Sequence, residues 1–190
     1  METSRTTREH IIQAAYHVLV EQGYDAATIK AIAREAGVAP GLLHYYFANK
    51  DELFVEVLKD ISRRYTESGY QRKSSLPPDQ LREATLNDML QRTLKNPGAY
   101  RLRYELFALG FRNPALQPAI RSLLESGRSG ISHIVDAVAS ERSFDADTLA
   151  SILLACIDGL ALQHLAEPDF DIESAYRLLS RMVKSLLESE

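Results

Sequence analysis

Hydrophobic residues recur along this chain at the three- and four-residue spacing of helices, and no segment alternates in the way a strand does. The first pattern begins at Thr6 and ends at Gly23, and the second begins at Thr28, a good N-cap residue, and ends at Gly37. Their expected inward faces are Ile11, Ala15, Val18 and Leu19 in the first helix and Ile29, Ile32, Ala33 and Ala36 in the second. The opening of the chain is therefore predicted to be helical.

A third helix of about two turns is predicted to begin at Pro40, since proline suits the first helical position. A fourth is expected to follow Asn49, with Glu52 as its capping partner and an inward face that includes Phe54. The segment Ser74–Asp79 reads as a loop, after which helices are expected at about 80–95, 99–110, 114–140, 146–166 and 172–188. The predicted fold is all-α, with a small N-terminal domain over 5–65 and a larger helical domain over 74–190.

Composition narrows the class of protein. The chain has 190 residues, one cysteine and a net charge of −4, and residues 1–73 are neutral, so the later part carries the excess of acid. A lone cysteine fits a reducing compartment, and the polar N-terminus has no signal-peptide pattern. No apolar run is expected to be long enough to span a membrane. We therefore expect a cytoplasmic protein without a membrane partner, in which any nucleic acid binds a local patch near the N-terminus.

The predicted short third helix carries an unusual set of side chains. At about 100° per residue, Leu43 and Phe47 fall on one side, and Gly41, Leu42 and Tyr45 fall on the other. The apolar pair is expected to hold the helix against its neighbours while the opposite side is displayed. Two short helices joined by a tight turn form a helix-turn-helix, here at about 28–47, whose second helix enters the major groove of DNA.

The chemistry of this segment agrees with a DNA-binding role. Gly41 allows close approach of the backbone, and tyrosine and histidine side chains donate to phosphate oxygens. Lys50 is expected beside free backbone N–H groups at the start of the fourth helix, and Lys30 is the long cation expected to reach a base edge or phosphate. The alternative is that His44 and the tyrosines pack between helices as ordinary amphipathic residues.

The stretch TIKAIAREAGVAPGLLHYYFANKDELF, residues 28–54, resembles the DNA-binding domain of the TetR (tetracycline repressor) family of bacterial regulators. The family pattern is matched by Gly37, Val38, Gly41, Leu43, Tyr46, Phe47, Lys50 and Leu53. The resemblance covers roughly residues 5–65. It implies a homodimer of nine-helix chains, with three N-terminal helices for DNA and a ligand pocket in the larger domain.

Position by position, the resemblance implies a set of DNA contacts. They are Thr28 and Lys30 from the second helix, Ala39, Pro40, Gly41 and Leu42 facing bases, and His44, Tyr45, Tyr46 and Lys50 mostly facing the DNA backbone. Three positions depart from the family pattern: Ala39 replaces a capping serine, Leu42 replaces a serine or threonine, and His44 replaces a tyrosine. Because the base-facing set has no Arg, Asn or Gln, direct readout is expected to use contact between Leu42 and thymine methyl groups.

The last two predicted helices are apolar over more of their surface than one neighbour requires, which indicates a two-fold interface between chains. The expected dimer contacts are Leu149, Leu153, Cys156, Leu160, Leu178, Met182 and Leu186. The alternative is that these helices lie inside the core of one chain. The stretch IDGLALQHLAEPDFD also resembles the C-terminal domain of the choline-responsive betaine-pathway repressors, although this shorter match transfers no ligand.

A small-molecule pocket is expected between the fifth and eighth helices. Its candidates by composition are Tyr100, Tyr104, Phe107, Phe111, His133 and Gln163, although aromatic residues at helical spacing also pack as plain core. The junction Phe111–Pro114 is a hypothetical route by which a change in the pocket reaches the DNA-binding domain.

Other classes of function find little support. Cys156 lies in an apolar face, the histidines have no metal-ligand spacing, and no glycine-rich phosphate loop follows a strand, so neither an enzyme nor a cofactor or metal site is expected. A helical protein-binding module is the stronger alternative, but it leaves Lys30, Lys50 and the tyrosines unexplained. We interpret the sequence as a ligand-responsive transcriptional regulator, a repressor, which binds palindromic double-stranded DNA as a homodimer. The ligand is expected to favour a different separation of the two recognition helices.

Overall fold

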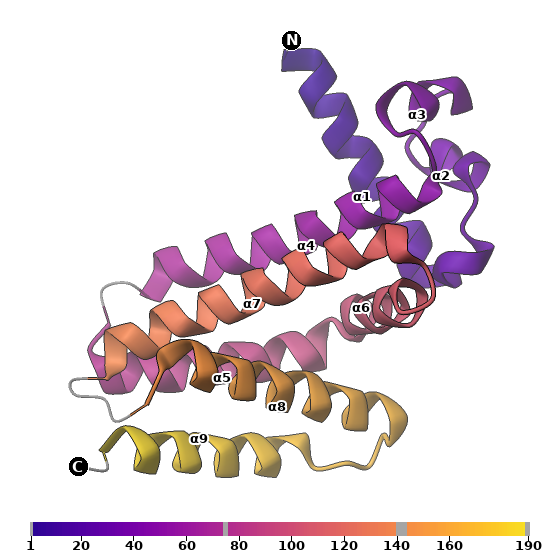
Figure 1. Cartoon of the computed structure of the whole chain (residues 1–190). Coiled ribbons are helices and arrows are strands. Elements are labelled where there is room, and N and C mark those ends of the chain that lie inside the picture. Colours follow the sequence, from indigo (N-terminus) through magenta and orange to yellow (C-terminus); the bar gives the residue numbers. More distant parts are fainter. Residues whose placement is uncertain (1, 74–75, 140–143, 189–190) are drawn as a thin grey trace. The chain divides into compact units, whose positions relative to one another are not determined.

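The computed structural model describes residues 2–73, 76–139 and 144–188, and over these ranges it contains nine α-helices, one short 3-10 helix and no strand (Figure 1). The helices are α1 (Glu2–Ala26), α2 (Ile29–Glu35), α3 (Pro40–Tyr46), α4 (Lys50–Lys73), α5 (Pro78–Lys95), α6 (Pro97–Gly110), η1 (Pro114–Leu116), α7 (Gln117–Val138), α8 (Ala146–Ala166) and α9 (Ile172–Glu188). The all-α prediction is confirmed, and α8 and α9 have the expected bounds.

The first helix departs from its prediction. It begins at Glu2 rather than at Thr6, so the start predicted at Thr6 is wrong. Gly23 does interrupt it, with φ 73° and ψ 171°, a conformation that favours glycine because it has no Cβ. Helical turns resume after this kink and continue to Ala26.

Four predicted helix starts are confirmed by their capping bonds. Thr28 Oγ1 accepts from the N–H of Ala31 (3.1 Å), and Asn49 Oδ1 accepts from the N–H of Glu52 (2.9 Å). The carboxylates of Asp145 and Asp171 accept from N–H groups three residues on, at 2.8 and 2.9 Å. Such bonds satisfy N–H groups that the first turn of a helix leaves unpaired.

The chain divides into two compact units, Met1–Arg63 with Arg101–Leu123, and Arg64–Tyr100 with Leu124–Glu190. In the first unit, α2 packs against α1 and α3, as Figure 1 shows. All the predicted inward residues of α1 and α2 are buried there except Ile29, which is half-buried. A Cβ at Gly110 would collide with Cδ1 of Ile120, so any other residue there requires the Ile120 side chain to shift.

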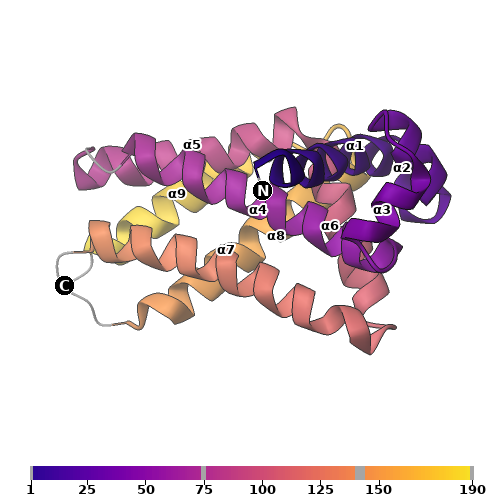
Figure 2. The same ribbon diagram turned by 90° about the horizontal axis from the view of Figure 1, so that it is seen from above.

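In the second unit, α9 packs against both α5 and α8 (Figures 1 and 2). Its core is Leu86, Ile131, Val135, Ala146, Leu149, Ala150, Leu153, Ile157, Leu179 and Val183. Within the described residues, α8 alone is long and apolar enough to cross a membrane by length and composition, with a mean hydropathy of 1.7, contrary to the expectation from sequence. One third of that window is buried against the unit, and core helices of soluble proteins meet the same criterion.

Candidate nucleic-acid interface

The turn between α2 and α3 is held by backbone hydrogen bonds. The N–H of Gly37 donates to Arg34 O (3.2 Å), and the N–H of Val38 donates to Ala33 O (3.0 Å). Gly37 has φ 64°, in the left-handed region where glycine ends a helix without strain. This local bonding brings the chain directly from the end of α2 to the start of α3.

The third helix is anchored on one side and exposed on the other, as the helical wheel predicts. Leu43 is fully buried and Phe47 is 2% exposed, whereas Tyr45 is 77% exposed. Gly41 and His44 are also exposed. The remaining outward positions are mixed: Ala39 and Pro40 are exposed, while Leu42 and Tyr46 are half-buried. The rings of Tyr45 and Tyr46 meet edge to face at 5.0 Å.

The start of α3 depends on Pro40 alone. Ala39 occupies the N-cap position and makes no side-chain capping bond, in agreement with the departure noted in the sequence. Proline at the first helical position fixes φ near the helical value and has no N–H to leave unpaired. Substitution of Ala39 by a capping residue would therefore strengthen this end of the helix.

An open groove of about 540 Å³ runs beside α2 and α3. Both cations of α2, Lys30 and Arg34, line it together with Thr28, Val38 and Pro40. Lys30 and Arg34 are both exposed and are four residues apart, so they lie on one side of the helix. The sequence reasoning named Lys30 and missed Arg34, although the four-residue spacing was the available signal.

Lys50 is half-buried at the first position of α4, and its ammonium is already engaged within the protein. Nζ donates to Tyr24 O (2.6 Å) and lies 4.0 Å from the centre of the Tyr24 ring. The expected free N–H groups beside it are partly occupied. Glu52 Oε2 accepts from the N–H of Ala48 (2.7 Å), and Asn49 accepts from that of Glu52.

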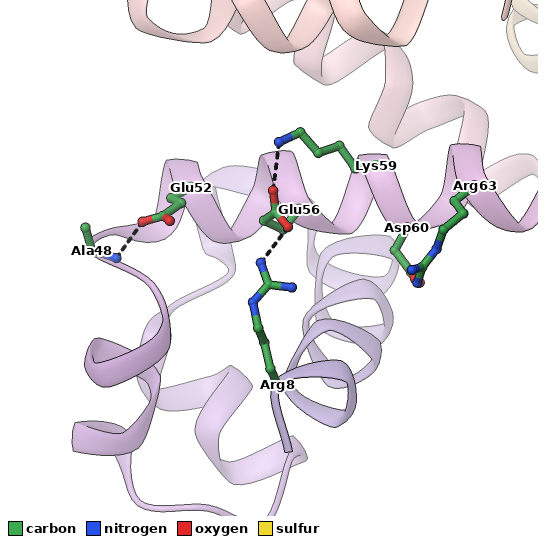
Figure 3. A network of polar contacts seen from close by, with 7 residues as sticks. All are labelled: Arg8, Ala48, Glu52, Glu56, Lys59, Asp60 and Arg63. Carbon is green, nitrogen blue, oxygen red and sulfur yellow. Dashed lines mark hydrogen bonds and ion pairs between the residues drawn. The ribbon is translucent and has the colours of Figure 1, made fainter. Parts of the chain in front are cut away.

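Polar contacts tie α4 to α1 behind the recognition helix (Figure 3). Glu56 accepts hydrogen bonds from Arg8 (2.5 Å) and from Lys59 (2.8 Å). The Arg8 guanidinium also lies 5.2 Å from the centre of the Phe47 ring. Partial burial raises the pKa of Glu56, but hydrogen bonds from Lys59 and Arg8 outweigh it, so the net pKa lies below its usual value.

The six pocket candidates are divided between the two units, three in each. Tyr104 and Phe107 lie together in the first unit, with ring centres 6.5 Å apart, and Tyr100 is half-buried in the second. Phe111 (76% exposed), His133 and Gln163 are exposed rather than interior, which corrects the expectation that they lie inside a pocket. Among the described residues, no group of three His, Cys, Asp or Glu side chains is placed to hold a metal ion.

The predicted dimer contacts fall into three sets by exposure. Leu149 and Leu153 are 6% and 7% exposed and belong to the core of the second unit, so little of either side chain is left for a second copy to cover. Cys156 and Leu160 are half-buried and pack against that core. The three residues from α9, Leu178, Met182 and Leu186, are 55%, 61% and 42% exposed. Periodicity identified apolar residues on α8 but did not tell the inner side from the outer one.

The outer side of α8 is apolar, as expected of a helix with more apolar surface than one neighbour requires, but the predicted dimer contacts did not include its residues. Ile152 and Leu162 are 55% and 52% exposed, and helical geometry places Ala155, Gly159 and Ala166 on the same side. Nothing lies within 4 Å of the position that a Cβ would take at Gly159. We call this set, with Leu178, Met182 and Leu186 of α9, the outer apolar face.

Two family models match this chain. One is described as bacterial regulatory proteins, tetR family, and matches residues 11–57; the other is described as tetracyclin repressor-like, C-terminal domain, and matches residues 77–187. Together they cover the helix-turn-helix and nearly all of the later helices.

Individual relatives agree with the family models. The HTH-type transcriptional regulator PksA of Bacillus subtilis (strain 168) is 26% identical over 167 residues, which are 85% of this chain and 80% of the relative. The HTH-type transcriptional regulator BetI of Stenotrophomonas maltophilia (strain R551-3) is 28% identical over 90% of this chain and 88% of its own length. A crystal structure of a TetR transcription regulator from Haloarcula marismortui ATCC 43049 superposes with a TM-score of 0.83 at 25% identity, covering 97% and 100% of the two chains.

Proposed function

Because this chain belongs to the TetR family of bacterial regulatory proteins, we propose that it represses transcription by binding a palindromic operator as a homodimer, under the control of a small-molecule effector. Members of this family are DNA-binding transcription factors and not enzymes. We place the protein in the cytoplasm, where it has access to DNA.

The observation that carries the proposal is the display of α3. The buried side chains of Leu43 and Phe47 anchor this seven-residue helix to the first unit, while Gly41 and Tyr45 are exposed on its opposite side. This arrangement lets the outward residues enter the major groove without loss of the anchors. The predicted base-facing residues are Ala39, Pro40, Gly41 and Leu42, and the predicted phosphate contacts include His44, Tyr45, Tyr46 and Lys50, together with Thr28 at the start of α2.

The groove beside α2 adds positive charge to this surface. Lys30 and Arg34 are exposed on its wall, in a chain whose overall charge is −4. Cations placed beside a recognition helix attract phosphate groups locally, and the affinity that they supply falls as salt is added. We therefore add Arg34 to the proposed DNA contacts.

The homodimer is supported by the outer apolar face. Five large apolar side chains on α8 and α9 are 42–61% exposed, which is unusual for a surface that stays in water. Small residues at Ala155 and Gly159 would let the same helix of a second copy approach closely across a two-fold axis. A second copy, whose face is identical, would therefore bury these side chains.

The effector is expected to contact the polar interior of the second unit. Tyr176 on α9 is 3% exposed, and its hydroxyl interacts with the buried Thr93 side chain without forming a hydrogen bond of good geometry among the described residues. Burial is the main cause that raises the pKa of Tyr176, so the hydroxyl remains a neutral donor. A ligand with an acceptor atom would satisfy it. Tyr100, half-buried in the same unit, remains a candidate contact.

The test is a selection of binding sites from random duplex DNA with the purified full chain at two salt concentrations. Recovery of an inverted repeat, with half-sites about one helical turn or about 34–36 Å apart, is the expected result. Enrichment of a single unpaired half-site would overturn the dimeric operator. Recovery of no preferred sequence even at low salt would overturn the regulator and favour a helical module that binds proteins.

A further inference from the structure

Tyr24 lies at the kink of α1, directly after Gly23. Because Gly23 has φ 73°, the chain leaves the regular course of the helix there, and Tyr24 makes contacts outside it. A Cβ at Gly23 would lie 3.1 Å from Glu105 Oε1, so this part of α1 approaches α6 closely. Tyr24 was not a candidate in the sequence, since its contacts come from residues far along the chain.

The backbone of Tyr24 joins α6 to α4. Its N–H donates to Glu105 Oε2 on α6 (3.0 Å), and its carbonyl oxygen accepts from Lys50 Nζ on α4 (2.6 Å). The Lys50 ammonium also lies over the Tyr24 ring, 4.0 Å from its centre. A cation over an aromatic face is attracted by the ring's negative surface. The position of Lys50 therefore depends on that of Tyr24.

The side chain of Tyr24 is fixed from two further directions. Its hydroxyl donates to Asp51 Oδ1, and the other oxygen of Asp51 accepts from Asn113 Nδ2 at 3.4 Å, in the turn after α6. Its ring packs on Phe54, which is fully buried, at a centre distance of 4.9 Å. Tyr24 is thus held by α4 and by α6, while Asn113, in the turn after α6, holds Asp51 rather than Tyr24 itself.

We propose that Tyr24 is the positioning residue for Lys50 and holds its ammonium ready for a DNA phosphate, an inference that rests on the proposed phosphate contact of Lys50. A free lysine side chain loses rotamer entropy when it binds, and a side chain already held in place loses less. An ammonium has three N–H donors, of which the Tyr24 carbonyl takes one. The other two N–H groups are available to donate to an anion at the start of α4, where Lys50 is half-buried.

The test is a double-mutant cycle on the operator duplex recovered by selection. Tyr24→Leu removes the ring beneath Lys50, and we expect a loss of affinity of about 2- to 12-fold, which corresponds to one side chain that must be ordered on binding. The same change in a Lys50→Ala background is expected to have no further effect. Tyr24→Phe keeps the ring and loses only the bond to Asp51, so we expect it to bind the operator more tightly than Tyr24→Leu and less tightly than the native chain. An equal loss in both backgrounds overturns the proposal.

A second readout separates positioning from mere stability. In the protein without DNA, the ε-methylene NMR signals of Lys50 are expected to be shifted upfield by the Tyr24 ring and to lose that shift in Tyr24→Leu. Tyr16→Leu, at another half-buried tyrosine of α1, is the matched control and is expected to keep the shift. An unshifted Lys50 in the native chain overturns the proposal.

The NMR shift of Lys50 also distinguishes a failure of the proposed DNA-binding function from a failure of the proposed role of Tyr24. If the native protein binds no DNA, the proposed function fails, whereas the NMR shift still decides whether Tyr24 holds Lys50. Should Tyr24→Leu fail to fold, Glu105→Ala removes the acceptor of the Tyr24 N–H from α6 instead. We expect it to reduce the Lys50 shift, and a full native shift in that variant overturns the proposal.

Discussion

Leu42 is the side chain on α3 on which sequence discrimination is expected to depend most. The proposed base-facing residues include no Arg, Asn or Gln, so the best specific contact available to them is between Leu42 and a thymine methyl group. Leu42 is half-buried, which leaves part of its side chain on the surface while the rest supports the helix.

We predict that Leu42→Ala reduces discrimination at one thymine position by about 1 kcal/mol, roughly fivefold, and lowers overall affinity less than that. Binding of the variant to a panel of operators with single base changes measures both quantities. Lys50→Ala is the contrasting variant, since loss of a phosphate contact is expected to weaken binding to every sequence alike. A uniform loss in Leu42→Ala would show that the leucine supports α3 and reads no base.

Two residues show which features could be predicted from the sequence, and one shows a feature that could not. Leu43 and Phe47 were predicted as anchors because helical period alone fixes which side chains share a face, and both are buried. Lys50 was placed on the correct surface, yet its hydrogen bond to Tyr24 was not foreseen. That bond joins residues 26 positions apart, and no local pattern encodes it.

At the scale of elements, the contact between α1 and α4 depends on charge. Glu56 on α4 binds Arg8 of α1 and Lys59 of its own helix, with a side chain that is 21% exposed (Figure 3). Because the net pKa of Glu56 is lowered in the folded chain, its ionised form favours folding. The ionised Glu56 contributes its full stabilisation at a pH above the pKa that Glu56 has in the unfolded chain. That stabilisation is lost as the pH falls through the lower pKa that Glu56 has in the folded chain.

We predict that Glu56→Gln lowers the free energy of unfolding at about pH 7 and that the difference from the native chain becomes smaller at an acidic pH, as Glu56 of the folded chain becomes protonated. Urea unfolding curves of the two proteins at each pH give this difference. Glu52→Gln, which affects the Ala48 cap and not the link to α1, serves as a control. A difference of the same size at both pH values would contradict an ionic role.

Helix starts were predicted well at four capping residues and at Pro40, which begins α3 without a side-chain cap. Thr28, Asn49, Asp145 and Asp171 begin their helices as expected, because a short polar side chain satisfies free N–H groups locally. The start of α1 was misjudged, since Thr6 lies inside the helix. A threonine followed by a glutamate is a weak signal in a polar stretch that is itself compatible with helix.

At the scale of the whole molecule, the proposed dimer depends on Gly159. A glycine inside a helix costs about 1 kcal/mol relative to alanine, and in the part of the chain that the structure describes no other side chain occupies the space beside Gly159. That space lies on the outer apolar face. A second copy packed against this face explains why a small residue is suitable there.

We predict that Gly159→Leu leaves the single chain as stable as before, or more stable by up to about 1 kcal/mol, and weakens the dimer by about 1–3 kcal/mol or more through overpacking. Sedimentation equilibrium measures the change from a pair of 21.3 kDa chains to single ones. Gly130→Leu on α7 is the matched control, because its Cβ position is equally open and it lies off the outer apolar face. An undiminished dimer in Gly159→Leu would place the interface elsewhere.

The sequence by itself determined the all-α class, the positions of most helices, and the family to which the helix-turn-helix belongs. The family came from the resemblance of residues 28–54. The fold class and the helix positions follow from local physics, since helical period, capping side chains and the special conformations of glycine and proline act within a few residues. The same local rules predicted that Leu43 and Phe47 anchor α3 while Tyr45 is displayed, and the structure agrees.

Only the tertiary structure decided which apolar side chains face the core and which remain outside. Leu149 and Leu153 lie inside one chain while Ile152 and Leu162 lie outside, because α8 is apolar nearly all round and its orientation is set by packing on α9. The contacts of Tyr24 with Lys50, Asp51 and Glu105 are likewise tertiary, since they join residues that are brought together only when α1, α4 and α6 pack. Long-range contacts of this kind carry no signal in the local pattern of a single sequence.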